Sequence, residues 1–140
     1  MVQPGAISLS FAGETDEVPR MRHFLALWLR ENEVPEPESS DLLLAASEAI
    51  TNACLHARPA PSSVHISCSR RDGRISVGIS DQGEGFSLDP IVMEQPPPLD
   101  RTGGRGLMLI RHLTDQVTIR TTTRGTTLTL VREIVPRATR

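Results

Sequence analysis

The sequence has no strong net charge, no long hydrophobic run and no pair of cysteines at the spacing of metal ligands. Its formal net charge of −2 provides no basic field to attract nucleic acid or anionic lipid. Its longest apolar runs are far too short to span a bilayer. Cys54 and Cys68 each lack a nearby second cysteine, which excludes a zinc site built on them. We therefore expect no direct nucleic-acid binding and no membrane association.

The remaining composition is that of a soluble globular protein. Hydrophobic residues make up 38% and charged residues 23% of the 140 positions, enough for one domain with a substantial core. The first five residues lack the charged and apolar regions of a signal peptide, so we expect a cytoplasmic protein with two buried, reduced thiols. We expect a single domain over residues 1–140, with a flexible tail at 135–140.

Hydrophobic periodicity divides most of the chain into short strands and helices. Alternating apolar residues predict strands near 7–11, 64–68, 75–79, 117–121 and 128–130. Asp72-Gly73 predicts a tight turn that joins two of these strands in a hairpin. Apolar residues at helical spacing predict helices over 18–32, from an N-cap at Ser39 or Ser40 to the prolines at 59 and 61, and from 104 or 105 to 113.

Residues 80–106 differ from the rest of the chain. They contain five glycines and four prolines and show little periodicity. Compact domains rarely hold so long an irregular segment unless it serves a function such as a lid over a site. We therefore predict a lid at 87–103.

The second predicted helix carries a polar stripe in an otherwise apolar run. Glu48, Asn52 and His56 recur every four residues, which places them along one side of the helix, whereas Ile50 and Ala53 lie on the opposite side, with Ala57, and face the core. An acid, an amide and an imidazole in a row indicate a chemical role. A solvated helix face is the structural alternative, and it is the commoner cause of such a stripe.

Two glycine-rich stretches follow, each weak evidence alone. Asp81 comes directly after a predicted strand, and glycines two and four residues later let the backbone pass close to a flat ligand, although Asp-Gly turns are common. The stretch 103–107 reads Gly-Gly-Arg-Gly-Leu before a helix, where free backbone N–H groups can hold an anion. It is not a Walker loop, because the Gly-Lys-Ser/Thr ending is missing.

The order and spacing of these three motifs together are far more specific than any one motif alone. Glu48-x-x-x-Asn52 on a helix, Asp81-x-Gly-x-Gly after a strand and Gly104-x-Gly-Leu before a helix resemble the N, G1 and G2 boxes of the GHKL ATP-binding superfamily. Ser-Glu-Ala-x-Thr-Asn-Ala-x-x-His in a stand-alone domain of this length is most similar to the anti-sigma factor serine kinases of bacterial partner-switching systems. The resemblance implies the Bergerat ATP-binding fold, an α/β two-layer sandwich whose mixed, mainly antiparallel sheet carries helices on one face.

The resemblance also implies roles for individual residues. Glu48 would act as general base on a substrate serine, and Asn52 would ligate Mg²⁺ through its amide oxygen. Asp81 would accept a hydrogen bond from the adenine amino group, and Arg20 would contact a protein partner. The residues that would bind ATP are Asn52, Asp81, Gly83, Gly85, Gly104, Arg105, Gly106, Leu107, and Thr126 or Thr127 on the last strand.

Three functions are compatible with this resemblance. The first is a Mg·ATP-dependent protein serine kinase that sequesters a sigma factor, phosphorylates an anti-sigma factor antagonist and forms a homodimer. The second is a nucleotide-binding regulator with little phosphate transfer; Glu48 favours the kinase, because a pure binding module needs no base there. The third, a histidine kinase catalytic domain, is disfavoured because 140 residues leave no room for a dimerising helical hairpin and the sequence after His23 is not that of a phosphoacceptor histidine.

Overall fold

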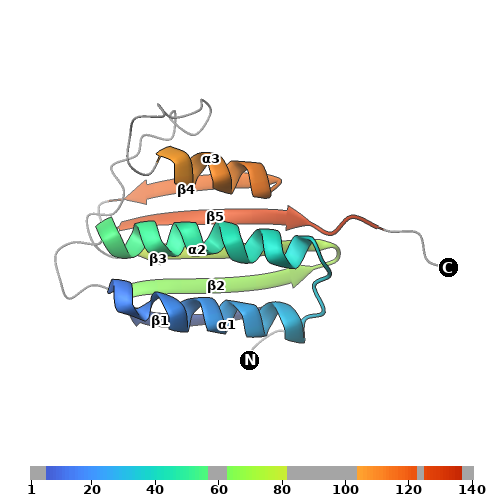
Figure 1. Cartoon of the computed structure of the whole chain (residues 1–140), viewed down its shortest axis with the longest axis horizontal. Coiled ribbons are helices and arrows are strands. Elements are labelled where there is room, and N and C mark those ends of the chain that lie inside the picture. The colour runs from blue at the N-terminus through green and yellow to red at the C-terminus, as the bar shows by residue number, and fades with distance from the viewer. Residues whose placement is uncertain (1–5, 57–62, 82–103, 123–124, 137–140) are drawn as a thin grey trace.

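The protein folds into a sheet with helices on one face (Figure 1). The structure is a computed structural model that describes residues 6–56, 63–81, 104–122 and 125–136. The strands are β1 (Ala6–Ala12), β2 (Ser63–Arg71), β3 (Arg74–Asp81), β4 (Gln116–Thr122) and β5 (Gly125–Glu133). The helices are α1 (Val18–Glu31), α2 (Glu38–His56) and α3 (Gly104–Leu113), and a 3₁₀ turn, Thr15–Glu17, precedes α1. These elements confirm the predicted α/β two-layer sandwich.

The sheet has the strand order β1-β2-β3-β5-β4. All four strand pairs in the described residues are antiparallel, so the sheet is simpler than the mixed sheet that we predicted. Asp72 adopts a positive φ of 58° in the predicted hairpin turn between β2 and β3. The chain then passes through α3 to the edge strand β4, and β5 returns between β4 and β3.

The two faces of the sheet differ in chemistry because side chains alternate along each strand. Ile66 of β2, Ile79 of β3 and Leu128 of β5 lie side by side in the register and face the helices, where they are buried. The next residues in the same register, Ser67, Gly78 and Thr129, face the other way. The helix-covered face is therefore the apolar core, and the open face carries small polar side chains.

The central helix α2 lies close to the sheet because its inner side is made of small residues. Ala45, Ala49 and Ala53 are fully buried, as is Ile50, which confirms the predicted core side of this helix. Trp28 of α1 is also buried in the core. None of the helices in the described ranges is long and apolar enough to span a membrane.

The start of α2 differs from the prediction. The helix begins at Glu38, so a cap at Ser39 or Ser40 is wrong. The physical reason is that the Glu36 carboxylate accepts a hydrogen bond from the backbone N–H of Ser40 at 3.1 Å, which satisfies a free donor of the first turn. An acidic side chain before the helix thus does what a serine cap would do.

The same end of α2 is fixed by charged side chains that bind other parts of the chain. Glu38 is fully buried and accepts a hydrogen bond from the backbone N–H of Val135 at 2.8 Å. Asp41 pairs with Arg132 of β5 at 2.9 Å, and Arg132 also donates to the Leu113 carbonyl at the end of α3 at 3.3 Å. The predicted tail at 135–140 therefore begins at an anchored residue, and its last four residues lie outside the described ones.

Candidate functional site

The three sequence motifs meet at one end of the molecule. Figure 1 shows that the second half of α2, the end of β3 and the start of α3 lie at the same end, opposite the C-terminus. Because α2 and β3 run in the same direction, their C-terminal ends come together there, and α3 packs beside α2. Segments far apart in sequence are thereby gathered into one site.

Gly106 at the start of α3 lies against Glu48 and Asn52. A Cβ atom placed on Gly106 would lie 3.3 Å from Glu48 Oε2 and 3.4 Å from Asn52 Nδ2. The first separation is tighter than ordinary van der Waals contact and the second is at its lower limit, so a larger residue at 106 would press on Glu48. The glycine thus keeps a space open between the start of α3 and the polar stripe of α2.

Two polar side chains near this end of α2 have no partner in the part of the chain that the structure describes. Both Glu48 and Asn52 are half-buried, and among the described residues neither makes a hydrogen bond or ion pair. Their position next to the α3 N-terminus gives one carboxylate and one amide on the helix side of the sheet that are available to a ligand. His56, the third member of the stripe, is the last residue of α2.

The acidic residue of the second motif lies on the same side of the sheet. Asp81 is the last residue of β3, is only 3% exposed and faces the helices. Its partner in the β3–β5 register is Thr126, which is 1% exposed. A buried carboxylate and a buried hydroxyl in neighbouring strands can together recognise one polar edge of a ligand.

The structure distinguishes the two threonines that the sequence left as alternatives. Thr126 faces the helices beside Asp81, whereas Thr127 faces the open side of the sheet and its hydroxyl lies 2.8 Å from the Ser80 hydroxyl. Thr127 is therefore on the wrong face for a ligand that contacts Asp81, and we omit it from the site. Alternation along the strand is the physical reason.

The remaining predicted ATP-binding residues differ in where they lie in the fold. Gly104 and Arg105 are the first residues of α3, where the backbone N–H groups of a helix start are free to hold an anion. Leu107 is 6% exposed and its side chain packs in the core; its place in the ATP-binding motif stays a prediction. Gly83, Gly85 and the predicted lid at 87–103 lie outside the described residues.

Arg20 lies in the first turn of α1, and α2 separates this helix from α3 (Figure 1). Its guanidinium pairs with Glu17 at 3.0 Å, and its side chain is 73% exposed. Such a side chain is accessible to another protein and contributes little to the fold.

Neither cysteine is a candidate nucleophile. Burial and, to a smaller extent, the nearby Glu17 carboxylate raise the pKa of the Cys54 thiol to about 11, and burial raises the pKa of Cys68 to about 12. Both thiols are reduced and protonated at neutral pH, as predicted for buried cysteines. In the described part of the chain, no group of three or more His, Cys, Asp or Glu side chains can hold a metal ion. A metal here would depend on Asn52, phosphate oxygens and water, the type of site that Mg²⁺ favours.

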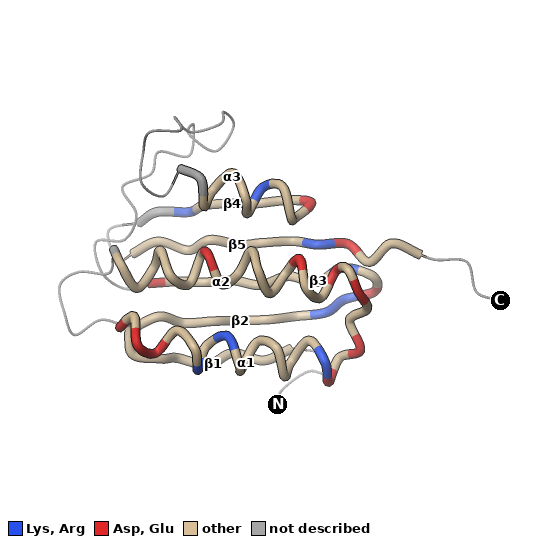
Figure 2. The backbone as a smooth tube through the Cα atoms, viewed as in Figure 1, with Lys and Arg blue, Asp and Glu red and all other residues tan. Residues whose placement is uncertain are grey.

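Charge along α2 has one sign. Figure 2 shows acidic residues and no basic ones on this helix in the part that the structure describes, and its sequence from Glu38 to His56 contains no lysine or arginine. The acids are Glu38, Asp41 and Glu48. Glu38 and Asp41 bind Val135 and Arg132 at the start of the helix. Glu48 is therefore the acid of this helix that lies next to the start of α3.

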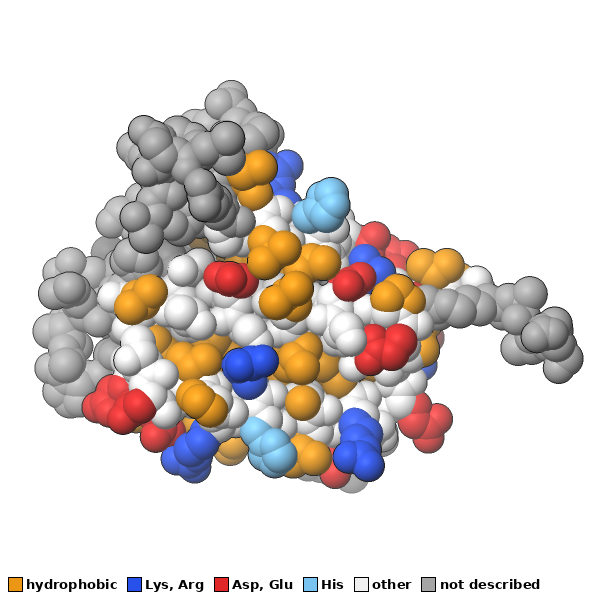
Figure 3. Space-filling view, in the orientation of Figure 1, with side chains coloured by type: hydrophobic (Ala, Val, Ile, Leu, Met, Phe, Trp, Pro, Cys, Tyr) orange, Lys and Arg blue, Asp and Glu red, His pale blue; other side chains and the backbone are white. Residues whose placement is uncertain are grey.

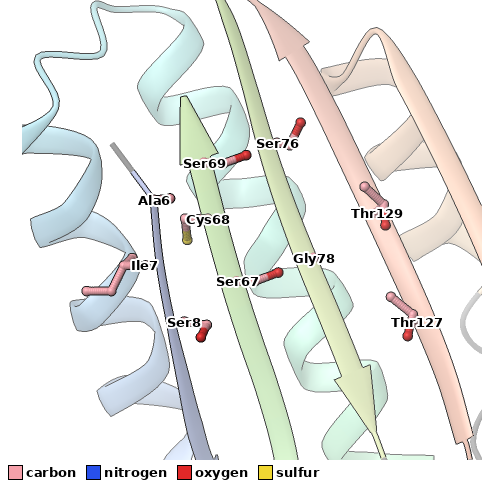
Figure 4. Close-up of a pocket in the computed structure, with 10 residues that line it drawn as sticks. All are labelled: Ala6, Ile7, Ser8, Ser67, Cys68, Ser69, Ser76, Gly78, Thr127 and Thr129. Atoms are coloured by element: carbon pink, nitrogen blue, oxygen red, sulfur yellow. The ribbon is translucent and has the colours of Figure 1, made fainter. Parts of the chain in front are cut away.

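A hollow of about 670 Å³ on the open face of the sheet is separate from this site (Figure 4). Most of the side chains around it are small and polar, and they come from four strands. The lining residues are Ala6, Ile7, Ser8, Ser67, Cys68, Ser69, Ser76, Gly78, Thr127 and Thr129. None of the residues that face the helices at the three motifs takes part, so the hollow and the site lie on opposite faces.

Comparison with known proteins identifies the family. The profile of the histidine kinase-like ATPase domain matches residues 11–132. The chain belongs to this family. The match confirms the resemblance to the GHKL superfamily and covers the N-box helix, the Asp81 motif and the start of α3.

Curated relatives include two kinds of bacterial regulator. The chain is 36% identical over 104 residues to the serine-protein kinase RsbW of Staphylococcus epidermidis, which covers 67% of this chain and 65% of that protein. It is 41% identical over 88 residues to RsbW of Oceanobacillus iheyensis, covering 56% of each. It is 30% identical over 106 residues to the anti-sigma F factor of Pasteuria penetrans, covering 69% of each. The matched regions thus span a little over half to about two thirds of these relatives.

Solved structures show the same fold. The RsbU and RsbW domains of Rv1364c from Mycobacterium tuberculosis match with a TM-score of 0.73 at 19% identity, covering 95% of this chain and 33% of that one. A histidine kinase domain from Erythrobacter litoralis matches with a TM-score of 0.61 at 18% identity, covering 86% of this chain and 60% of that one. At these identities the likeness is one of fold.

Sequence reasoning missed two exposed leucines beside the site. Leu44 and Leu55 are 48% and 52% exposed and lie on the same stripe of α2 as Glu48. Their spacing, four residues before and seven after Glu48, is the signal that could have found them.

Proposed function

We propose that this protein is a Mg·ATP-dependent protein serine kinase and anti-sigma factor, which phosphorylates an anti-sigma factor antagonist and sequesters a sigma factor. The observation that carries the proposal is the meeting of Glu48, Asn52 and Gly106 at the start of α3. A carboxylate, an amide and a helix N-terminus in one small region support phosphoryl transfer, which needs a base, a metal ligand and a phosphate site. Homology to serine-protein kinases and an anti-sigma factor supports the same function.

Glu48 is the proposed general base. It accepts the proton of the substrate serine hydroxyl as that oxygen attacks the γ-phosphorus of ATP, and the bond to the β,γ-bridging oxygen breaks to release ADP. A half-buried carboxylate with no partner among the described residues is free to take that proton. In the pure binding module that we considered as an alternative, this acid would have no function.

The chain fits Mg·ATP at this end of the sheet. The space that Gly106 leaves beside Glu48 and Asn52 is where a larger side chain would intrude, and Asn52 offers a hard oxygen donor. Mg²⁺, when bound there, would neutralise charge on the phosphates. Gly104, Arg105 and Gly106 would hold the phosphates at the α3 N-terminus, and Asp81 with Thr126 would contact the adenine.

The proposed partners are a sigma factor and an antagonist protein, and we propose a homodimer as the working assembly. Arg20 is the proposed partner contact, because its guanidinium is largely exposed and its pair with Glu17 lies on the same surface. We also propose that residues 87–103 form the lid over the nucleotide and that the protein works in the cytoplasm.

The test is a transfer assay with γ-labelled ATP, Mg²⁺ and the anti-sigma factor antagonist encoded in the same genome. We expect label on an antagonist serine and calorimetric binding of Mg·ATP. Asp81→Asn should weaken ATP binding by about 1–3 kcal/mol. The amide replaces one acceptor oxygen of the buried carboxylate with an N–H donor, which does not pair with the adenine amino group. Asn52→Ala should lose Mg·ATP binding and transfer together. Tight binding of ATP and sigma factor without transfer to the antagonist would replace the kinase with the binding module.

A further inference from the structure

Two large apolar side chains are exposed on either side of the proposed base. Leu44 and Leu55 are about half exposed and lie on the same stripe of α2 as Glu48. At a rise of about 1.5 Å per residue, they lie roughly 6 and 10 Å from Glu48 along the helix. Figure 3 shows hydrophobic side chains gathered along the line between α2 and α3, with an acidic side chain among them. We refer to Leu44, Glu48 and Leu55 as the acceptor surface.

These leucines are not explained by the core. The inner side of α2 is already filled by alanines and Ile50, and the start of α3 packs against Glu48 and Asn52. A half-exposed leucine gains only part of the free energy of burial, and a polar helix former would serve the fold equally well at either position. An apolar group kept at the surface beside a functional site is typical of a surface that another molecule covers.

We infer that the acceptor surface is the docking site of the protein whose serine is phosphorylated; the inference rests on the proposed kinase function. The reason is geometric. A general base acts only within hydrogen-bond distance of the hydroxyl that it deprotonates, so the acceptor protein must cover Glu48 during transfer. Side chains within two or three helical turns on the same stripe are then covered by the same protein.

The chemistry of the surface specifies the kind of segment it accepts. Two leucines on either side of a carboxylate favour an acceptor serine with apolar side chains near it. The helix α2 itself carries no lysine or arginine, so acidic side chains placed on Leu44 or Leu55 would be repelled by Glu48 and would gain no cation from this helix in exchange. A sigma factor has no need to reach Glu48, and its binding should not depend on the two leucines.

The inference is tested by measuring steady-state transfer to the same-genome antagonist with the full chain and its variants. Leu44→Gln and Leu55→Gln remove the apolar contacts and keep good helix formers at both positions. Each should raise KM for the antagonist about tenfold, the effect of losing one well-packed interface side chain, with kcat and the Kd of Mg·ATP unchanged. Leu9→Gln on the edge strand β1 is the matched control, since Leu9 is 45% exposed and lies outside the acceptor surface.

The outcomes separate this inference from the proposed function. If the unaltered protein transfers phosphate and both leucine variants keep its KM, the acceptor surface is wrong while the kinase stands. If Leu9→Gln raises KM as much as Leu44→Gln does, the effect is general and the docking site is also wrong. If the unaltered protein transfers no phosphate, the kinase function falls, and the acceptor surface falls with it.

Discussion

The two ends of α2 use similar side chains for different purposes. At its start, Glu38 accepts a backbone N–H from Val135 and Asp41 pairs with Arg132, so both acids are bound to the chain itself. In its second half, Glu48 and Asn52 are half-buried beside Gly106 and have no partner among the described residues. Acids that already have a partner stabilise the fold, and those left without one are available for chemistry. The predictions below test this distinction.

The largest expected difference is between two acids of the same helix. Glu48→Gln keeps size and polarity but removes the base, so phosphate transfer should fall by roughly 10²-fold or more while ATP binding is nearly normal. Asp41→Asn should do the reverse. It leaves Arg132 of a partly buried pair without its anion, at a cost of about 1–3 kcal/mol in unfolding free energy, and it should keep the transfer rate.

Urea denaturation and single-turnover phosphate transfer, measured on Glu48→Gln and on Asp41→Asn, test these two expectations. If Glu48→Gln transfers at the original rate, Glu48 is not the base. If Asp41→Asn slows transfer as strongly as Glu48→Gln does, the two ends of the helix are not functionally distinct.

The next expected effect is a pH dependence of stability that comes from the two buried thiols rather than from the acids of α2. Their folded-state pKa values of about 11 and 12 lie above the ordinary value of 9.0, so the unfolded chain loses these protons first. The free energy of unfolding should be nearly constant below about pH 8 and then decrease as pH rises, by about 1 kcal/mol per thiol at pH 10. The chain has no tyrosine and all fifteen of its Lys+Arg residues are arginine, so no other side chain titrates in this range.

Urea unfolding between pH 7.5 and 10.5 measures this decrease. The double variant Cys54→Ala, Cys68→Ala is the control and should show little dependence on pH above 9. A decrease of equal slope in that variant would mean that the thiols are not its source.

A smaller effect is expected from two glycine-to-alanine variants, one at the site and one on the open face of the sheet. Gly106→Ala places a methyl group 3.3 Å from Glu48 Oε2 and 3.4 Å from Asn52 Nδ2, so the Glu48 side chain must move by a few tenths of an ångström. Transfer should fall about tenfold, in line with the sensitivity of catalysis to small displacements, and stability should not fall, since alanine favours helix.

Gly78→Ala is the counterpart on β3. Its Cβ would lie 2.7 Å from the Ser67 hydroxyl, so that hydroxyl must rotate away, and stability should fall slightly while transfer is kept. Thermal melting and transfer kinetics on both proteins distinguish the two sites. Loss of transfer in Gly78→Ala at unchanged stability would mean that the open face takes part in catalysis.

The sequence was sufficient to predict the fold and the motifs but not the details that depend on register. Glu48, Asn52, Asp81 and the stretch before α3 could be found because they stand at fixed spacings in elements with clear periodicity. The choice between Thr126 and Thr127 could not be made, because a shift of one residue in a strand exchanges its two faces.

Other details depend on contacts between distant segments. The role of Gly106 beside α2 and the ion pair between Asp41 and Arg132 join residues that only the folded chain brings together. The start of α2 was misjudged because a serine is the usual cap, whereas here Glu36 accepts the hydrogen bond. Local sequence preference does not contain this information.

The smallest expected effect on stability belongs to Arg20, at the N-terminal end of α1. Its pair with Glu17 is largely exposed to water, so Arg20→Ala should change the unfolding free energy by no more than about 0.5 kcal/mol. Binding of the sigma factor or of the antagonist should weaken nonetheless, because an exposed arginine can form strong charge-assisted contacts at an interface. Arg20→Glu should weaken it further by placing two acids side by side. Calorimetry should find the Mg·ATP affinity of both variants unchanged, and full binding of both partners by Arg20→Glu would remove Arg20 from the partner surface.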